Sequence, residues 1–346
     1  MSQEIVHNIE PTKENPRSSE GAFVTLSNNR VLFVYTQFYG GAADESPARL
    51  VGIESGDGGK TWSAPREILA NSGGNNVMSV SLLRLKSGRI ALFYLKKNSW
   101  IECLPYVRFS DDEAKTWSAP VVMTAAPGYF VLNNDRVIQL SSGRLIAPLA
   151  FHRSKGSDPH SSRSFDARAM ALWALSDDEG KTWREARSWW ALPVASGTGL
   201  QEPGVVECAD GTLLCFARTD KGAQFELRST DKGETWSAPV AGPLLSPVAP
   251  ASIKRLHNSA RLIALYNDHS GRVAFPKGKR TPLTLALSDD GGKSWHGHKE
   301  IETDPGGWYC YTAIHFIEKT ILLGYCAGDK VVGGLNRLRI RSISLP

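Results

Sequence analysis

Ser176–Trp183 reads SDDEGKTW, and the chain repeats the same pattern five times. Each copy follows S-x-D-x-G/A-x-T/S-W, and together the copies use five of the ten tryptophans in the chain. A pattern of this length does not recur so often by chance, so it marks a structural repeat. The other copies are Ser55–Trp62 (SGDGGKTW), Ser110–Trp117 (SDDEAKTW), Ser229–Trp236 (STDKGETW) and Ser288–Trp295 (SDDGGKSW).

The repeated pattern has the composition of a tight turn. The aspartate at its third position can accept hydrogen bonds from backbone N–H groups of that turn. The glycine at its fifth position adopts a left-handed backbone at little steric cost, although the second copy has Ala114 there. The closing tryptophan is a large apolar group, and we expect it to anchor the turn to its own sheet.

A second repeat counts the structural units independently. It consists of an apolar run, a short polar turn and another apolar run, which is typical of a β-hairpin. The first repeat recurs on average every 58 residues or so, and about six such units fill 346 residues. The two repeats predict one domain, residues 1–346: an all-β, six-bladed β-propeller of four-stranded antiparallel blades. The six hairpins are Leu26–Thr36, Leu85–Leu95, Leu140–Ala150, Cys208–Arg218, His257–Asn267 and Ile317–Cys326.

The last blade lacks one strand, because the chain ends before a sixth outer turn. Its first three strands are expected near Tyr311, near Leu322 and at Leu338–Leu345. We expect the N-terminal segment Glu4–Ile9 to supply the fourth strand. That pairing would close the ring and remove its exposed sheet edges.

The repeated turn resembles the Asp-box, or BNR repeat, of the sialidase (neuraminidase) superfamily. In that superfamily the motif joins the two outer strands of a propeller blade. The resemblance covers essentially the whole chain, and it implies a glycoside hydrolase with its site at the centre of the ring.

Composition excludes several other classes of protein. The net charge of +5 is spread along the chain without a basic block, so nucleic acid is not an expected partner. No apolar run approaches the roughly 18 residues that a membrane span needs. The first residues are polar and acidic, which predicts a cytoplasmic protein unless a secretion signal has been removed. The five cysteines have no metal-type spacing and are expected to be buried free thiols, so neither a metal nor a cofactor is implied.

Polar residues recur at the start of each predicted inner strand, where a propeller has the mouth of its central channel. Examples are Glu20, Asn134, Asp135, Arg136 and Glu202. Strand ends are often polar simply because they meet solvent. Six convergent starts with several charged groups among them favour a polar site in the channel.

Four segments are similar to the catalytic segments of sialidases. The best match is QEPGVVECADGTLLCFARTD at residues 201–220. By this resemblance Glu202 would be the general base and Arg218 would bind the carboxylate of a sialic acid. Asp44, in the loop before the first turn motif, matches the acid/base residue, with Glu45 beside it as a rival.

The other two matches lie near the end of the chain. Arg280 matches a second arginine that binds the carboxylate. Tyr311 matches the tyrosine nucleophile, and Tyr309, two residues earlier on the same strand face, is its main competitor.

One departure from the family concerns a third arginine. Sialidases open their first blade with Phe-Arg-Ile-Pro, but the corresponding place here holds Ser19 or Glu20, and Arg17 is out of register. Arg136 is the candidate replacement, unless it forms an internal ion pair with Asp135 or Glu202. The expected substrate-binding set is therefore Arg218, Arg280, Arg136, Glu20, Asp135, Asn134 and Tyr309.

These residue types suit hydrolysis of a sialoside. A sialic acid carries a carboxylate on its anomeric carbon, which would repel a carboxylate nucleophile but not a neutral tyrosine. Glu202 would take the proton of Tyr311, and Asp44 would protonate the leaving oxygen. The resemblance thus implies an exo-α-sialidase type of enzyme acting on an acidic glycan or sialoside.

Two alternatives stay open. One is a glycosidase or polysaccharide lyase of the same fold acting on another acidic sugar, uronic or deaminated, which the missing arginine and Glu20 favour. The other is a non-catalytic propeller that binds glycans, because the turn motif alone is structural.

Overall fold

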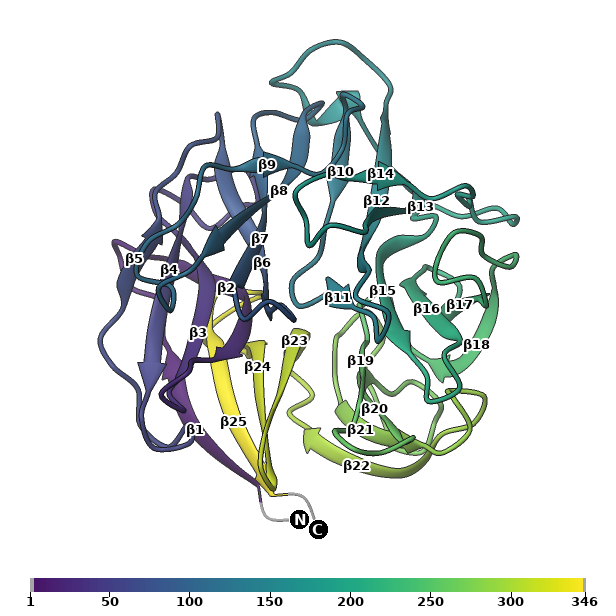
Figure 1. Ribbon diagram of the computed structural model, residues 1–346. Helices are drawn as coiled ribbons and strands as arrows, with labels where there is room; N and C mark the ends of the chain where they lie inside the picture. Colours follow the sequence, from purple (N-terminus) through teal and green to yellow (C-terminus); the bar gives the residue numbers. More distant parts are fainter. Residues whose placement is uncertain (1–2, 345–346) are drawn as a thin grey trace.

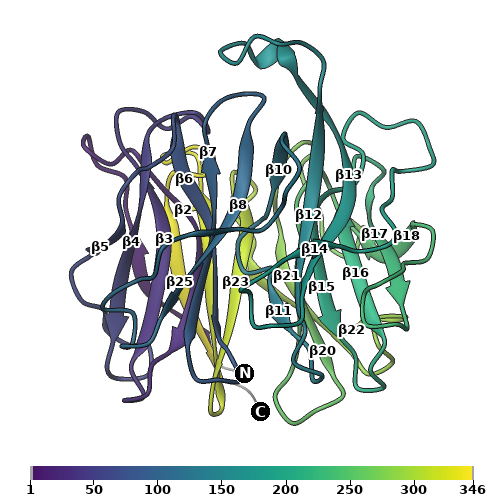
Figure 2. The same ribbon diagram turned by 45° about the horizontal axis from the view of Figure 1, so that its top comes forward.

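The computed structural model describes residues 3–344 and contains strands β1–β25 and one short 3₁₀ helix, η1 (Ser162–Ser164). The strands form five sheets, all of them mainly antiparallel. Figure 1 shows these sheets arranged around a common centre, with β2, β6, β15, β19 and β23 nearest to it. The β12–β13 hairpin, which carries η1, projects beyond the rest of the molecule (Figure 2).

Four of the sheets have four strands each. In three of these, neighbouring strands follow one another directly in the sequence. The first holds β2 (Arg17–Thr25), β3 (Val31–Phe38), β4 (Ala48–Ser55) and β5 (Arg66–Leu69). The second holds β15 (Gln201–Glu207), β16 (Leu213–Arg218), β17 (Ala223–Ser229) and β18 (Val240–Leu245). The third holds β19 (Ser252–Arg255), β20 (Leu262–Asn267), β21 (Leu283–Ser288) and β22 (His296–Glu302).

The fourth four-stranded sheet unites the two ends of the chain. It holds β23 (Trp308–Ile317), β24 (Thr320–Gly328), β25 (Leu338–Ser344) and β1 (Gln3–Ile9). β1 pairs antiparallel with β25, from Gln3 opposite Ile343 to Ile9 opposite Leu338. This is the place expected for Glu4–Ile9, whereas Leu345, at the end of the expected last strand, lies outside the described residues.

The remaining sheet has nine strands. A single parallel pair, Tyr129 with Cys103, joins its two halves. The first half holds β6 (Asn76–Arg84), β7 (Ile90–Lys97), β8 (Cys103–Ser110) and β9 (Val121–Val122). The second half holds β10 (Tyr129–Val131), β11 (Ile138–Gln139), β12 (Leu145–Ser154), β13 (Phe165–Ser176) and β14 (Arg184–Glu185).

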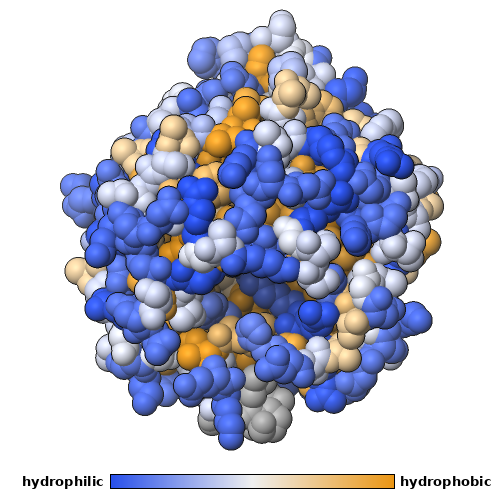
Figure 3. All heavy atoms as spheres, viewed as in Figure 1, coloured by the Kyte–Doolittle hydropathy of each residue, from blue (hydrophilic) through white to orange (hydrophobic). Residues whose placement is uncertain are grey.

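The hydrophobic core lies mainly between neighbouring sheets. Val24 and Leu32 of the first sheet, for example, share one buried cluster with Val80 and Leu92 of the nine-stranded sheet. The face seen in Figure 3 is mostly hydrophilic, with apolar side chains scattered across it. None of the helical structure in the described range has the length and apolar character of a membrane span.

The five repeated turns connect the outer two strands of their sheets and share one hydrogen-bond pattern. In the third copy, Asp178 Oδ1 accepts from Thr182 N at 3.0 Å, and Gly180 N donates to Ser176 Oγ at 2.8 Å. The fifth position is left-handed even without glycine, because Ala114 has φ of 62°. The aspartate therefore caps the turn as the sequence predicts.

The tryptophan of the turn does not always anchor to its own sheet, which corrects the sequence-based expectation. Trp236 follows β17, but its ring stacks on Trp173 of β13 in the neighbouring sheet, with centroids 4.4 Å apart. Its Nε1 donates to Gly233 O within its own turn at 3.1 Å. The motif therefore joins adjacent sheets as well as adjacent strands.

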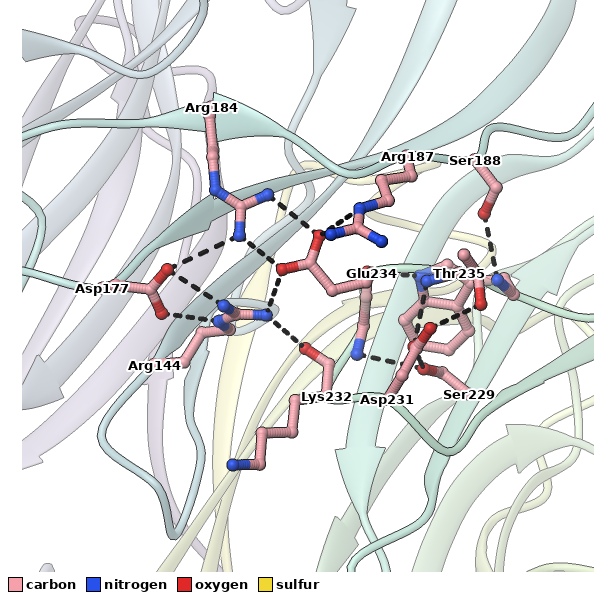
Figure 4. Close-up of polar contacts among 12 residues, drawn as sticks. Arg144, Asp177, Arg184, Arg187, Ser188, Ser229, Asp231, Lys232, Glu234 and Thr235 are labelled. Atoms are coloured by element: carbon pink, nitrogen blue, oxygen red, sulfur yellow. Dashed lines mark hydrogen bonds and ion pairs between the residues drawn. The ribbon is translucent and has the colours of Figure 1, made fainter.

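Ion pairs reinforce the junction between two of these turns (Figure 4). Arg144 donates to Asp177 of the third turn at 2.6 Å and to Glu234 of the fourth at 2.8 Å. Arg184 also donates to Glu234, at 3.0 Å. Because Glu234 joins two guanidiniums from the neighbouring sheet, the network fixes how the two sheets meet.

Deleting residues 1–10 should lower the melting temperature by several degrees, because β25 would lose its partner strand and expose a sheet edge. Thermal unfolding followed by circular dichroism measures this effect. An unchanged melting curve would count against a structural role for β1.

Asp178→Ala should destabilise the protein by about 1 kcal/mol, the typical cost of a lost capping side chain. Urea unfolding measures the change, and the activity of the folded fraction should be unaffected. Loss of turnover at normal stability would place this turn at the functional site instead.

Candidate active site

A cavity of about 450 Å³ lies among the inner strands and is lined by charged, polar and aromatic side chains. His152, near the end of β12, and Phe165, the first residue of β13, form part of its wall. The charged groups that line it are Glu20, Asp44, Lys97, Glu202, Arg218 and Arg280, and Tyr311 lies among them. The structure therefore gathers six of the residues predicted for the site: Tyr311, Glu202, Asp44, Arg218, Arg280 and Glu20.

Four inner strands carry the same irregularity, and it directs side chains into this cavity. In β2, β6, β15 and β23 the register with the next strand slips by one residue. The first residue of each bulge has a left-handed backbone, with φ of 55° at Glu20, 59° at Ser79, 49° at Glu202 and 58° at Tyr311. All four line the cavity. Left-handed non-glycine residues are strained and gather at functional sites, where bulges redirect side chains.

The neighbouring sequence accommodates these bulges with small residues. A Cβ on Gly21 would lie 2.4 Å from the ring of Phe33, and one on Gly204 would lie 2.3 Å from the ring of Phe216. Only glycine fits such close approaches. Gly21, next to Glu20, and Gly204, two residues after Glu202, thus allow each strand to carry a charged residue into the cavity.

Tyr311 and Glu202 meet across the cavity. The Tyr311 hydroxyl donates to Glu202 Oε1 at 3.0 Å, and Arg218 Nη1 donates to Glu202 Oε2 at 2.8 Å. Burial raises the pKa of Glu202, but the charges of Arg218 and Arg280 outweigh it, so the pKa is lowered. Burial and the Glu202 charge raise the pKa of Tyr311 well above its usual value. The site therefore pairs a neutral phenol with an ionised carboxylate that is placed to take its proton.

Arg280 lies against the same tyrosine. Its guanidinium is 5.5 Å from the ring centroid of Tyr311 and 5.3 Å from that of Trp308. Its backbone oxygen accepts from Tyr309 N at 2.9 Å, which fixes the loop to β23. Arg218 and Arg280 thus place two guanidiniums beside the Tyr311–Glu202 pair, a geometry suited to a carboxylate ligand.

Asp44 lies on an exposed loop whose backbone is held firmly. Asn76 Nδ2 and Lys97 Nζ donate to its carbonyl oxygen at 2.9 and 3.2 Å. Its carboxylate forms an ion pair with Arg17. Partial burial raises the pKa of Asp44, but the charge and hydrogen bond of Arg17 outweigh this, and the pKa is lowered. Beside Arg17, Asp44 is therefore ionised.

Arg17 is the charged residue that sequence reasoning set aside. It is buried, and its Nε donates to Ser19 Oγ at 3.2 Å, so the guanidinium lies beside the small side chain where the sialidase pattern has its arginine. Its Nη2 has no hydrogen-bond partner in the described structure. The available signal was spacing, because residues two apart share one face of a strand and Ser19 leaves room for Arg17.

Glu20 accepts a hydrogen bond from the side chain of another bulge residue, Ser79. Ser79 Oγ donates to Glu20 Oε2 at 2.7 Å, and no cation within the described chain forms an ion pair with Glu20. Burial raises the pKa of Glu20 to about 7, although the charge of Arg17 opposes the shift. This carboxyl group can therefore carry a proton near neutral pH.

Arg136 and Asp135 do not line the main cavity. Arg136 Nη2 donates to Ala251 O at 2.6 Å. Arg136 and Asp135 line a separate cavity of about 10 Å³. Asp135 accepts from Lys254 Nζ at 2.7 Å and from Ile314 N at 2.9 Å. These contacts tie inner strands together, so the structure does not bring Arg136 to the position of a third arginine.

Asn134 and Tyr309 also lie behind the cavity. Asn134 Nδ2 donates to Gly21 O at 2.8 Å and to Tyr311 O at 3.0 Å, which fixes two of the bulges. Tyr309 is buried in the core beside Tyr325. The bulge at Tyr311 breaks the alternation of the strand, so the two tyrosines do not share a face as the sequence suggested.

Sequence reasoning also missed an aromatic wall of the cavity. Trp100, Tyr129, His152 and Phe165 line it, and the rings of His152 and Phe165 stack at 4.6 Å. Lys97 Nζ lies 4.9 Å from the ring centroid of Trp100. These residues lie far from one another in sequence and carry no motif, so only the fold reveals them.

The chemistry available in the cavity is that of carboxylates, a phenol and guanidiniums. Among residues 3–344 no group of three or more histidine, cysteine, aspartate or glutamate side chains is arranged to hold a metal ion. The arrangement can bind an anion, take a proton from Tyr311 through Glu202 and move a proton through Asp44.

Comparison with known protein families gives one match that covers most of the chain. The model of the BNR repeat-like domain matches residues 69–322. A sialidase of Bacteroides fragilis is 26% identical over 331 residues, covering 86% of this chain and 57% of its own length. A sialidase of Micromonospora viridifaciens is 25% identical and covers 78% of this chain and 43% of its own length. This chain thus spans about half the length of these relatives.

Solved structures share the fold at lower sequence identity. A Dyadobacter fermentans protein of unknown function has a TM-score of 0.78 at 17% identity, and each chain covers 99% of the other. The intramolecular trans-sialidase of Ruminococcus gnavus has a TM-score of 0.72 at 16% identity, with 98% of this chain and 96% of that one covered. The all-β fold is therefore that of the sialidase β-propellers.

The raised pKa of Glu20 predicts a specific dependence of stability on pH. Because the pKa rises from 4.5 to about 7 on folding, Glu20 favours the folded state below pH 4.5, and this contribution is lost as the pH rises through about 7. Glu20→Gln cannot ionise, so its stability relative to the native protein should increase over that range. Urea unfolding at several pH values measures the difference. Parallel pH profiles for the two proteins would contradict the buried, proton-binding Glu20.

Proposed function

The chain belongs to the sialidase/BNR-repeat superfamily, and we propose that it is a glycoside hydrolase of the exo-α-sialidase type that releases a terminal acidic sugar. The observation that carries the proposal is the contact of Tyr311 with Glu202 beside two arginines. A phenol held by an ionised carboxylate is a nucleophile with its base already in place.

The number of blades and the closure of the ring are also part of this proposal. We count the nine-stranded sheet as two blades, because one residue pair joins its halves. With the four-stranded sheets this gives a six-bladed propeller in a single domain, with β1 closing the ring. The bulged inner strands then place their left-handed residues around one axis.

The proposed first step forms a bond between the Tyr311 oxygen and the anomeric carbon. Glu202 takes the phenolic proton, and the bond from the anomeric carbon to the leaving oxygen breaks as Asp44 donates a proton to that oxygen. Water then attacks the same carbon and gives a proton to Asp44, and Tyr311 leaves with the proton from Glu202. The configuration of the sugar is retained, because each step inverts it once.

Arg218 and Arg280 would bind the substrate carboxylate through paired hydrogen bonds. Arg17 is the third cation in this proposal, since its unpartnered Nη2 is buried next to Asp44. A substrate carboxylate that draws Arg17 away would also remove the charge that keeps Asp44 ionised. Asp44 could then carry the proton that the first step requires.

One observation favours a second candidate, a glycosidase or lyase of this fold for a different acidic sugar. Glu20 lines the cavity without an ion-pair partner among the described residues, and it can bond to a sugar hydroxyl. A uronic acid or a deaminated sialic acid would place its hydroxyl groups differently relative to Glu20. A purely glycan-binding role would leave the strained Tyr311–Glu202 pair unexplained.

The substrate class is tested by turnover of aryl glycosides of sialic acid, of its deaminated analogue and of uronic acids. We expect release of the aryl alcohol from the sialic acid glycoside. Release from a uronic acid glycoside alone would establish the second candidate, and release from none would contradict a hydrolase for these sugars.

Tyr311→Phe should abolish turnover and leave ligand binding intact, because the nucleophile is lost but the cavity is not. Glu202→Gln should be nearly as damaging, because the phenol would stay protonated. Steady-state kinetics and calorimetric binding separate the two effects. Tyr309→Phe is the matched control and should retain activity, whereas an inactive Tyr309→Phe beside an active Tyr311→Phe would overturn the assignment.

A further inference from the structure

Arg280 differs from the other guanidiniums near the cavity in what holds it. Arg218 pairs with Glu202 and Arg17 pairs with Asp44, both carboxylates. Within the described chain Arg280 forms no ion pair, and its side chain has one hydrogen bond, from Nη1 to the sulfur of Cys310 at 3.0 Å. A buried guanidinium needs an acceptor, and here the acceptor is a cysteine.

A second cysteine lies opposite the acceptor on the neighbouring strand. Cys310 and Cys326 lie directly opposite each other on β23 and β24, and both are fully buried. Burial raises the pKa of Cys310, but a hydrogen bond from Cys326 and the charge of Arg280 outweigh it, and the pKa is lowered. The contact from Arg280 Nη1, at 3.0 Å, is the hydrogen bond that connects this sulfur to the guanidinium.

The location of this contact connects it to the site. Cys310 immediately precedes Tyr311, and the Arg280 guanidinium lies against the rings of Tyr311 and Trp308. Stacking limits motion across the rings but leaves the guanidinium free to slide along them. The hydrogen bond to Cys310 removes that freedom by fixing Nη1 of a side chain that lines the cavity.

We propose that Cys310 is a positioning residue that holds Arg280 in the orientation needed to bind a carboxylate ligand. The proposal rests on the proposed function only for the ligand, because the contact itself lies within the protein. Cys310 does not touch the substrate in this account and acts through Arg280 alone. A sulfur atom can accept a hydrogen bond from the guanidinium in place of a carboxylate. A further carboxylate at this position would repel the carboxylate of the ligand.

The test compares Cys310→Ala with Cys326→Ala in the full-length chain. Both remove one buried thiol from adjacent strands, but only the first removes the acceptor of Arg280. Calorimetry should show that Cys310→Ala weakens binding of the N-acetylneuraminic acid glycal about tenfold. A loss of this size is expected when the charged hydrogen bond between Arg280 and the ligand carboxylate is weakened. The methyl ester of the glycal should lose much less, and Cys326→Ala should bind both like the native protein.

Further variants exclude a merely structural effect. Cys310→Ser keeps a weaker acceptor and should restore part of the affinity. Adding Cys310→Ala to Arg280→Ala should cause no further loss, because the thiol acts only through that arginine. Equal losses for the glycal and its ester, or additive losses in the double variant, would overturn the proposal.

A second readout needs no ligand. Arg280 should react faster with phenylglyoxal in Cys310→Ala than in the native protein or in Cys326→Ala, as followed by peptide mass spectrometry. Equal rates in all three would overturn the positioning role. If the native protein does not bind the glycal, the proposed sugar is wrong, and the labelling rates still decide the role of Cys310.

Discussion

The site depends on one backbone constraint, the left-handed residue at the start of four inner strands. In an ordinary strand, alternate residues point to opposite faces of the sheet. The bulge interrupts that alternation and turns Glu20, Ser79, Glu202 and Tyr311 towards a shared cavity. The amide of Asn134 bonds to the carbonyl of Tyr311 and to that of Gly21, so one side chain steadies two of the bulges. The outer turns and ion pairs then keep the sheets, and with them the bulges, in register.

The charges in the cavity follow from how each group is paired. Glu202 is ionised because Arg218 and Arg280 lie beside it, whereas Glu20 keeps its proton to about pH 7 because burial outweighs the charge of Arg17. Asp44 is ionised through Arg17. Two of the three carboxyl groups in the cavity are thus ionised and the third can carry a proton, whereas a glycoside hydrolase needs a base, an acid and a binding group. The proposed mechanism uses Glu202 and Asp44 in the first two of these roles and leaves Glu20 to contact the sugar.

Most of the architecture was accessible from the sequence, because turn motifs and hairpins are local patterns that repeat. The family resemblance also identified Tyr311, Glu202, Arg218, Arg280 and Asp44, which the structure brings to one cavity. Other features depend on contacts between distant segments. Arg17 lies beside Ser19 and donates to its hydroxyl, and Arg136 donates to the carbonyl of Ala251. The bulge at Tyr311 separates it from Tyr309, and Trp236 stacks on a neighbouring sheet. No single stretch of sequence records such contacts.

The central claim is that Tyr311, activated by Glu202, forms a bond to the anomeric carbon of an acidic sugar. The most direct measurement is to treat the native protein with a fluorinated sialosyl fluoride, which slows hydrolysis of a glycosyl–enzyme intermediate, and to locate the adduct by peptide mass spectrometry. The account predicts a single sugar adduct on the peptide that contains Tyr311, with fragmentation placing it on that residue. An adduct on Asp44 or Glu202, or turnover of aryl sialosides without any adduct, would contradict it.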